Sequence, residues 1–226
     1  DRKAKFYVRL TSKYTETSKQ SASTLGNNFI EPTVDMAYWE KEFAGKTAGV
    51  KNKFVAGRQF VQVGRGVAFA LTADGVMYEQ TGLAKRKGEW KAFALRQNPG
   101  NDMVDLSTSG SGRTKRDFYG FRGKYDVHSA AKMCLYAVRT NDRNKKNSPN
   151  SALQKHGFEP EYYGVVSEGR IIVKDLSYWA EFIYERGRTY DSATTTGSKE
   201  VNIRSNAVVA GLRGRASAAG ASSLPP

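Results

Sequence analysis

The residue types that could catalyse a reaction are few in this sequence, and none belongs to a complete motif. The segment "AGKT" at 44–47 ends as a phosphate-binding loop does, but that loop needs a glycine where the chain has Glu40. His128 and His156 lie far apart, and neither has a serine or cysteine nearby in a recognisable nucleophile setting. The Gly-rich "GSGR" at 110–113 lacks a preceding strand and a following helix. Carboxylates are scattered, so we expect no catalytic residues and a protein that is not an enzyme.

Cys134 is the single cysteine of the chain. One thiol excludes a disulfide framework and a multi-thiolate metal site, and two distant histidines do not suggest a metal site either. The flanking residues in "KMCLYAVR" are mostly apolar, which favours a buried free thiol. We therefore expect no metal and no cofactor that is certain to bind tightly.

Charge is the strongest feature of the composition. The 226 residues include 36 Lys and Arg against 22 Asp and Glu, a formal net charge of +14. An excess of this size favours an acidic partner: nucleic acid, an anionic membrane or acidic proteins. No apolar run approaches the ~20 residues of a spanning helix, so we expect no membrane span. The chain starts at Asp1, which fits either a removed targeting peptide or a missing start, and the sequence does not separate the two.

Two segments have the spacing of amphipathic helices. In "MAYWEKEF" (36–43), Met, Trp and Phe recur at i, i+3 and i+7 after a Glu-Pro entry. In "DLSYWAEFIYERG" (175–187), an Asp stands at the start and a Gly at the end, as helix caps do. We predict a helix in each segment.

Other segments have the period of strands. "AKFYVRL" (4–10) alternates as a half-buried strand does, and "GRIIVKD" (169–175) predicts a short strand. Residues 54–80 alternate and are rich in Val and Phe, which predicts two or three antiparallel strands with a hairpin turn at "ADG" (73–75). Residues 127–139 fit a helix or a strand equally well.

The two predicted helices share a pattern that suggests an internal duplication. "DMAYW" at 35–39 is echoed by "DLSYW" at 175–179, and Val-Arg at positions 8 and 138 is followed thirteen residues later by Ser-Ala in both places. The alternative is that short aromatic helices often look alike. We predict an α+β chain of small antiparallel-sheet-plus-helix modules, duplicated and joined by long extended loops. Its segments are a first module with a following β-hairpin region (1–97), a basic Gly/Ser- and aromatic-rich connection (98–126), a second module (127–190) and an extended low-complexity tail (191–226).

The first module resembles the small phycobilisome linker domain, known as the core-capping linker and as the C-terminal domain of rod linkers. The resemblance covers roughly 50 residues through "KFYVRLTSK", "TETSKQSAST" and "NNFIEPTVDMAYWEKEF", and it covers the second module more weakly. The family usually continues with Gly-Gly and an apolar strand, whereas Gly45 and Gly49 are separated here and the strand "RQFVQV" (58–63) comes later. No segment matches the large helical domain of rod linkers. The resemblance is to a divergent, red algal type of linker.

The resemblance implies a non-enzymatic structural linker. It would fill and bridge acidic phycobiliprotein hexamers and trimers, contact other linkers, tune energy transfer and lie at the stromal face of the chloroplast thylakoid membrane. Cys134 could carry a phycobilin through a thioether, although the chromophore-bearing linkers of red algae generally have several cysteines. The helical aromatics are expected to form module core, with the alternative that they neighbour the bilins of partner subunits: Tyr38, Trp39, Tyr178 and Trp179.

Basic and aromatic residues alternate in "GRTKRDFYGFRGKY" (112–125), which predicts a contact surface for the acidic partner. The predicted contact residues are Arg116, Phe118, Tyr119, Phe121, Arg122, Arg143, Lys145 and Lys146. The same pattern suits stacking on bases, so a basic RNA-binding or organellar ribosomal protein is the alternative function. Asp117 stands where an RNA-recognition motif requires glycine, and basic residues run through the whole chain rather than one face. We therefore favour a protein partner over nucleic acid.

Overall fold

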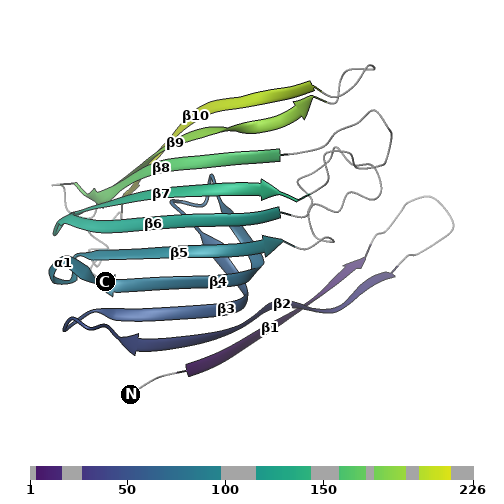
Figure 1. The fold of residues 1–226 in the computed structure, drawn as a ribbon, viewed down its shortest axis with the longest axis horizontal. Helices are drawn as coiled ribbons and strands as arrows, with labels where there is room; N and C mark the ends of the chain where they lie inside the picture. Colours follow the sequence, from purple (N-terminus) through teal and green to yellow (C-terminus); the bar gives the residue numbers. More distant parts are fainter. Residues whose placement is uncertain are drawn as a thin grey trace, which may run out of the picture.

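The computed structural model describes residues 4–16, 27–97, 116–143, 158–171, 176–191 and 199–214. These residues form one antiparallel sheet whose ten strands lie side by side in the order of the sequence (Figure 1). The strands are β1 (Ala4–Glu16), β2 (Asn27–Ala44), β3 (Lys51–Gln62), β4 (Ala70–Gly82), β5 (Gly88–Gln97), β6 (Arg116–His128), β7 (Ala131–Asp142), β8 (Phe158–Arg170), β9 (Leu176–Asp191) and β10 (Lys199–Gly214). Among the described residues, the only helical segment is the four-residue turn α1 (Leu83–Arg86), which connects β4 to β5 and has left-handed backbone angles at Ala84 and Lys85.

The α+β prediction was wrong, because both predicted helices are strands. Residues 36–43 lie within β2, and residues 176–187 lie within β9. Trp39 and Phe43 are four residues apart, a spacing that places two side chains on the same face of a strand as well as of a helix. Aromatic and β-branched residues favour the pleated conformation, and pairing with strands on both sides provides the backbone hydrogen bonds. Tertiary pairing thus decided between two periods that the spacing left open.

Other predictions had mixed outcomes. The strand at 4–10 is confirmed within β1, and the segment 54–80 contains two antiparallel strands, β3 and β4. The turn predicted at 73–75 was wrong, because these residues lie inside β4. A side chain on Gly75 would meet the carbonyl oxygen of Ala94 at 2.2 Å, so this glycine permits a close approach of two strands. Residues 199–214 of the predicted tail form β10.

The connections at the two ends of the sheet differ in length. At one end, two residues separate β6 from β7 and five separate β8 from β9. At the other end, 18 residues separate β5 from β6 and 15 separate β7 from β8. The sheet therefore has one end with short connections and one with long connections.

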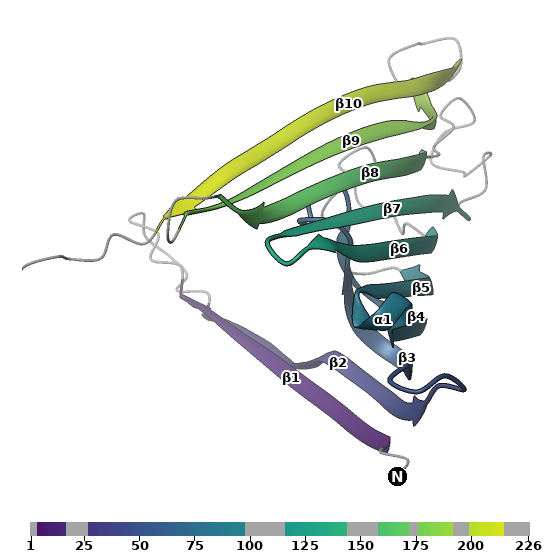
Figure 2. The same cartoon turned by 90° about the vertical axis from the view of Figure 1, so that its left-hand side faces the viewer.

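The sheet curves into a trough, with β1 and β10 at its two open edges (Figure 2). The connection between β3 and β4 folds over the concave side of this trough instead of extending away from it (Figures 1 and 2). Among the described residues, no helix is long and apolar enough to cross a membrane.

In the middle of the sheet, buried and exposed apolar residues occupy opposite faces. On β6, Phe118 is 7% exposed and its neighbour Tyr119 is 50% exposed, because successive side chains point to opposite faces. The register carries this alternation across the sheet, so that Phe118 pairs with Leu95 while Tyr119 pairs with Ala94. The concave face holds the hydrophobic core: Val61, Val63, Phe69, Ala73, Phe93, Leu95, Phe118, Tyr136, Val138 and Val166. The convex face carries most of the exposed apolar side chains, although Tyr7 and Val201 are exposed on the concave face.

The two Tyr-Trp doublets occupy inequivalent positions in this sheet. Tyr38 faces the concave side, where it stacks on Tyr7 at 5.1 Å, and Trp39 faces the convex side. In the second doublet, Tyr178 faces the convex side and Trp179 the concave side. The faces are exchanged, so the doublets do not form equivalent cores of a duplicated sheet-and-helix module.

Candidate functional site

The connection between β3 and β4, residues 63–69, packs on the concave face of the sheet, and we call it the hairpin tip. Its turn is closed by the N–H of Gly66, which donates to the carbonyl oxygen of Val63 at 2.9 Å. The N–H of Val63 in turn donates to the carbonyl oxygen of Phe69 at 3.1 Å. Gly64 and Gly66 have φ of +52° and +84°, values that side chains disfavour. The glycines of "VGRG" (63–66) therefore permit the turn.

Aromatic packing holds the hairpin tip against the concave wall. The ring of Phe69 stacks on Phe93 with a centroid distance of 5.5 Å and tilts against Phe118 at 5.3 Å. Val61 and Val63 are also fully buried there. Burial of a side chain of this size stabilises a fold by ~1.5–3 kcal/mol, so the tip is a packed part of the structure.

A buried carboxylate joins the hairpin tip to the far side of the trough. Glu181 on β9 is 1% exposed and accepts hydrogen bonds from the hydroxyl of Tyr136 at 2.7 Å and the backbone N–H of Arg65 at 3.1 Å. A side chain on Gly64 would meet Glu181 Oε1 at 2.0 Å, so the glycine leaves room for the carboxylate. A buried charge is tolerated only when it is hydrogen-bonded, as it is here. Glu181 therefore fixes the position of the tip.

The side chain of Arg65 lies on the concave side next to this link. Its guanidinium carbon is 4.8 Å from the ring centroid of Trp179, and Nη1 is 3.6 Å from Glu168 Oε2. Lys124 Nζ lies 3.7 Å from the other oxygen of Glu168. The hairpin tip thus places the guanidinium of Arg65 on the concave face close to Lys124, and both cations contact Glu168.

Charged residues continue along the concave wall. Lys91 Nζ donates to the carbonyl oxygen of Gln62 at 2.9 Å. Lys53 Nζ lies 3.8 Å from a carboxylate oxygen of Glu79. Further ion pairs on this face are Arg122–Glu89 and Lys5–Glu40. Where the hairpin tip does not cover it, the concave face therefore carries charged side chains that can be solvated by water.

The convex face has the opposite character in its middle. We call this surface the apolar belt and define it by Phe54, Ala56, Val76, Tyr78, Ala92, Ala94, Tyr119, Phe121, Leu135, Ala137, Tyr163, Val165, Ala180, Phe182, Val208 and Ala210, which the register places on one face. Many are more than a third exposed. Leu135 is 55% exposed and Phe182 46%. An apolar surface of this extent marks a contact with something other than water.

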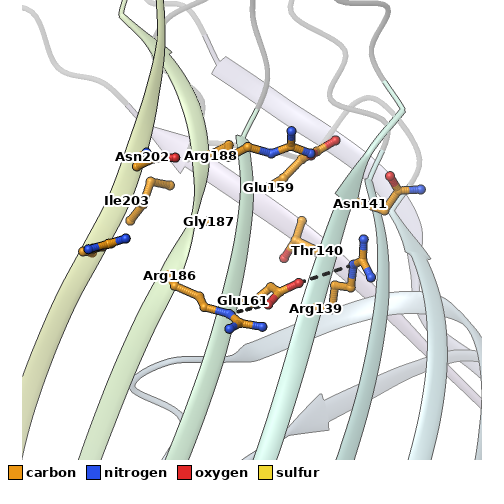
Figure 3. A pocket seen from close by; sticks show the side chains of 11 residues that line it. Arg139, Thr140, Asn141, Glu159, Glu161, Arg186, Gly187, Arg188, Asn202 and Ile203 are labelled. Atoms are coloured by element: carbon orange, nitrogen blue, oxygen red, sulfur yellow. Dashed lines mark hydrogen bonds and ion pairs between the residues drawn. The ribbon is translucent and has the colours of Figure 1, made fainter.

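Ion pairs border the apolar belt toward the end with long connections, and we call this border the convex rim. Arg58 Nη1 lies 3.6 Å from Asp74, and Arg96 Nε lies 2.9 Å from Asp117. On β7 to β9, Glu161 accepts from Arg186 Nε at 2.8 Å and lies 3.6 Å from Arg139 Nε (Figure 3). The convex face therefore changes from apolar to charged at one level of the sheet.

The predicted contact residues do not form one surface. Tyr119 and Phe121 are exposed on the convex face. Their neighbours Phe118 and Arg122 lie on the concave face, as does the buried Arg116. Arg143 is 2.9 Å from Asp117 at the convex rim, whereas Lys145 and Lys146 lie outside the described residues. Strand geometry thus divides the basic-aromatic segment between two faces.

The remaining predicted residues fall at separate places. Cys134 is partly buried on the concave face against the core, and a bilin at its thiol stays a prediction. Trp39 lies beside the apolar belt, where its ring packs edge-on to that of Phe54 with a centroid distance of 6.2 Å. His128 is exposed beside the β6–β7 turn, and His156 lies outside the described residues. In the described part of the chain, no group of three or more His, Cys, Asp or Glu side chains could hold a metal ion.

The sequence interpretation missed the hairpin tip and Glu181. The closely spaced glycines of "VGRG" signalled a tight turn between two apolar strands. Nothing in the sequence indicates that this turn meets Glu181, because 116 residues separate Arg65 from it. Neither a family model nor a curated protein matches the chain.

Proposed function

We propose that this sheet lies in a lipid bilayer, with its convex face against hydrocarbon and its concave face against water, and that it forms the wall of a passage for polar solutes. The observation that carries the proposal is the inverted distribution of side chains. Below the ion pairs of the convex rim, the apolar belt is exposed on the convex face, while further ion pairs and the hydrophobic core lie on the concave face. Alternation of apolar and polar residues along strands is the pattern that a sheet between lipid and water requires.

The length of the apolar convex face along β6, which continues beyond the apolar belt, supports this proposal. On β6, the outward positions from Tyr119 to Val127 are aromatic or apolar apart from a glycine. They span nine residues, about 26 Å along the strand at ~3.3 Å per residue, which is close to the ~9–11 residues with which a tilted strand crosses a bilayer. Short connections at one end and long ones at the other are also typical of such sheets.

The charge distribution favours lipid over an acidic protein as the occupant of the convex face. An acidic partner would be matched by basic residues within the contact surface. None of the belt residues is basic, and the cations of the described strands lie at the convex rim or on the concave face, with the exception of Lys41 on β2, which is opposite Phe54 at one side of the belt. The phycobilisome linker function, its thylakoid location and the RNA-binding alternative stay predictions.

In this function the hairpin tip narrows the passage. It occupies the concave side, and its Arg65 faces the water-accessible wall beside Glu168 and Lys124. Backbone groups at the edges of β1 and β10 need partners in lipid, so the proposal requires further strand pairing at both edges.

The experiment is reconstitution of the full chain into phosphatidylcholine vesicles. We expect the protein to float with the vesicles, to resist extraction by alkaline carbonate and to release an encapsulated polar dye. Recovery of folded, sheet-rich protein in the aqueous fraction would contradict the proposal. Binding of that aqueous protein to acidic phycobiliproteins or to RNA would support one of the sequence-based predictions instead.

A further inference from the structure

The described residues also contain an open groove at the convex rim, across β7 to β10, with a volume of about 340 Å³ (Figure 3). Four of its lining residues are arginines and two are glutamates: Arg139, Arg186, Arg188, Arg204, Glu159 and Glu161. Cations therefore exceed anions by two among the groups that line it.

The strand register leaves one pair of like charges face to face in this groove. Arg186 on β9 is the direct cross-strand partner of Arg204 on β10. Like charges directly opposite each other destabilise a sheet. Arg186 is held by Glu161 at 2.8 Å, while Arg204 has no ion pair within the described residues. An anion placed between these two guanidiniums would relieve the repulsion.

The groove is built rather than loosely arranged on its β8 and β9 side. Arg186 Nη2 donates to the hydroxyl of Tyr163 at 2.9 Å, and its guanidinium carbon lies 5.1 Å from the Tyr163 ring centroid. Arg188 Nη2 lies 3.2 Å from Glu159 Oε2. These contacts hold two arginines at fixed positions before any ligand binds, which lowers the entropy that binding would cost.

The apolar belt begins directly beside this groove. Along β9, the convex-facing residue next to Arg186 is Tyr184, and the one after that is Phe182. The cross-strand partner of Phe182 on β10 is Val208. A ligand with an anionic head and apolar chains would therefore place its two parts against matching surfaces at once. Arginine is suited to phosphate because its planar fork donates two parallel hydrogen bonds.

We propose that this groove binds the phosphate headgroup of an anionic membrane lipid, whose acyl chains lie along the apolar belt at β8 to β10. The assignment rests on the proposed function, because it places the convex rim at the level of the headgroups. Arg204 and Arg186 bind the phosphate, and Tyr163 positions Arg186 at the boundary between the headgroups and the hydrocarbon.

The test is a calorimetric titration of the full chain, folded in a neutral maltoside detergent. The probes are a water-soluble short-chain phosphatidylglycerol and a phosphatidylcholine with the same chains. We expect wild type to prefer phosphatidylglycerol and Arg204→Gln to bind it about tenfold more weakly, as expected for loss of one charge-assisted hydrogen bond. Arg204→Gln should also unfold at equal or higher denaturant concentration than wild type without lipid, because it removes a repulsion.

The matched control is Arg213→Gln, an exposed arginine on the same strand outside the groove. It removes the same charge and should leave phosphatidylglycerol affinity within about twofold of wild type, since a remote exposed charge is screened by salt. Equal losses in both variants would overturn the assignment, because net charge alone would then explain binding. Displacement by an equal concentration of inorganic phosphate would also overturn it.

The two proposals fail in different ways. Protein that enters vesicles and releases dye but binds both lipids equally would contradict the headgroup site and leave the membrane function standing. Protein that stays out of every vesicle would contradict both.

Discussion

On β9, Glu181 and Phe182 are neighbours in the chain and have exchanged the environments that their chemistry would give them in a water-soluble sheet. The carboxylate is 1% exposed on the concave side, and the aromatic ring is 46% exposed on the convex side. The concave face stabilises its buried charge through two hydrogen bonds. The convex face gives its exposed ring no comparable cover, so the difference indicates that the two faces were shaped by different surroundings.

The largest contrast is expected between aromatic truncations on the two faces. Phe69→Ala removes the ring that packs on Phe93 and Phe118 and leaves a cavity, which costs ~3–5 kcal/mol of the free energy of unfolding. Phe182→Ala on the convex face should cost less than half as much, because its surroundings can fill the space. Urea unfolding of both variants in vesicles measures the difference, and equal losses would remove the contrast between the faces.

A charge introduced into the apolar belt separates lipid from water as its environment. Leu135→Arg should destabilise the bilayer-inserted protein by ~2–4 kcal/mol if the belt faces hydrocarbon. In water the same exposed position would tolerate arginine within ~0.5 kcal/mol. Ser129→Arg in the β6–β7 turn is the control and should change stability little. Equal unfolding free energies of Leu135→Arg and wild type in vesicles would contradict the lipid contact.

Breaking the link between Glu181 and the hairpin tip should reduce stability by a smaller amount. The loss of protection from hydrogen exchange should be confined to the tip and the residues next to it. Glu181→Ala leaves the Tyr136 hydroxyl and the Arg65 N–H without their acceptor, at a cost of ~1–3 kcal/mol. Tyr136→Phe removes one hydrogen bond to the carboxylate but leaves the Arg65 N–H with its acceptor, so it should reduce stability less than Glu181→Ala. Hydrogen exchange at residues 61–69 should accelerate more in Glu181→Ala than in Tyr136→Phe. Unchanged exchange there would mean that packing alone holds the tip.

The smallest effect is expected for an ion pair on the concave wall. Lys53→Gln breaks a 3.8 Å contact with Glu79 between partly exposed side chains. Such pairs contribute ~0.2–1 kcal/mol, and salt screens them. The free energy of unfolding should change less between low and high salt for the variant than for wild type. A loss above 2 kcal/mol would show that the concave wall is not solvated as we infer.

Some of this structure could be predicted from the sequence, and some could not. Alternation in "AKFYVRL" and in 54–80 indicated strands correctly, because a period of two is local information. In "DMAYW" and "DLSYW", side chains four residues apart fit both periods, and pairing with distant strands decided in favour of β2 and β9. The alternation of aromatic residues in β6 was visible in the sequence. Which of them are exposed could not be predicted, because it depends on which face of the sheet the hairpin tip covers.

The most direct test uses the three tryptophans as reporters of the two faces. Trp39 and Trp90 lie on the convex face, and Trp179 lies on the concave face beneath Arg65. Three variants, each with two Trp→Phe changes, retain one tryptophan apiece and are reconstituted with lipids brominated in the acyl chains. We expect strong quenching of Trp39 and Trp90 fluorescence and little quenching of Trp179 fluorescence. Equal quenching of all three, or none of any, would contradict the central claim that one face of this sheet contacts lipid and the other contacts water.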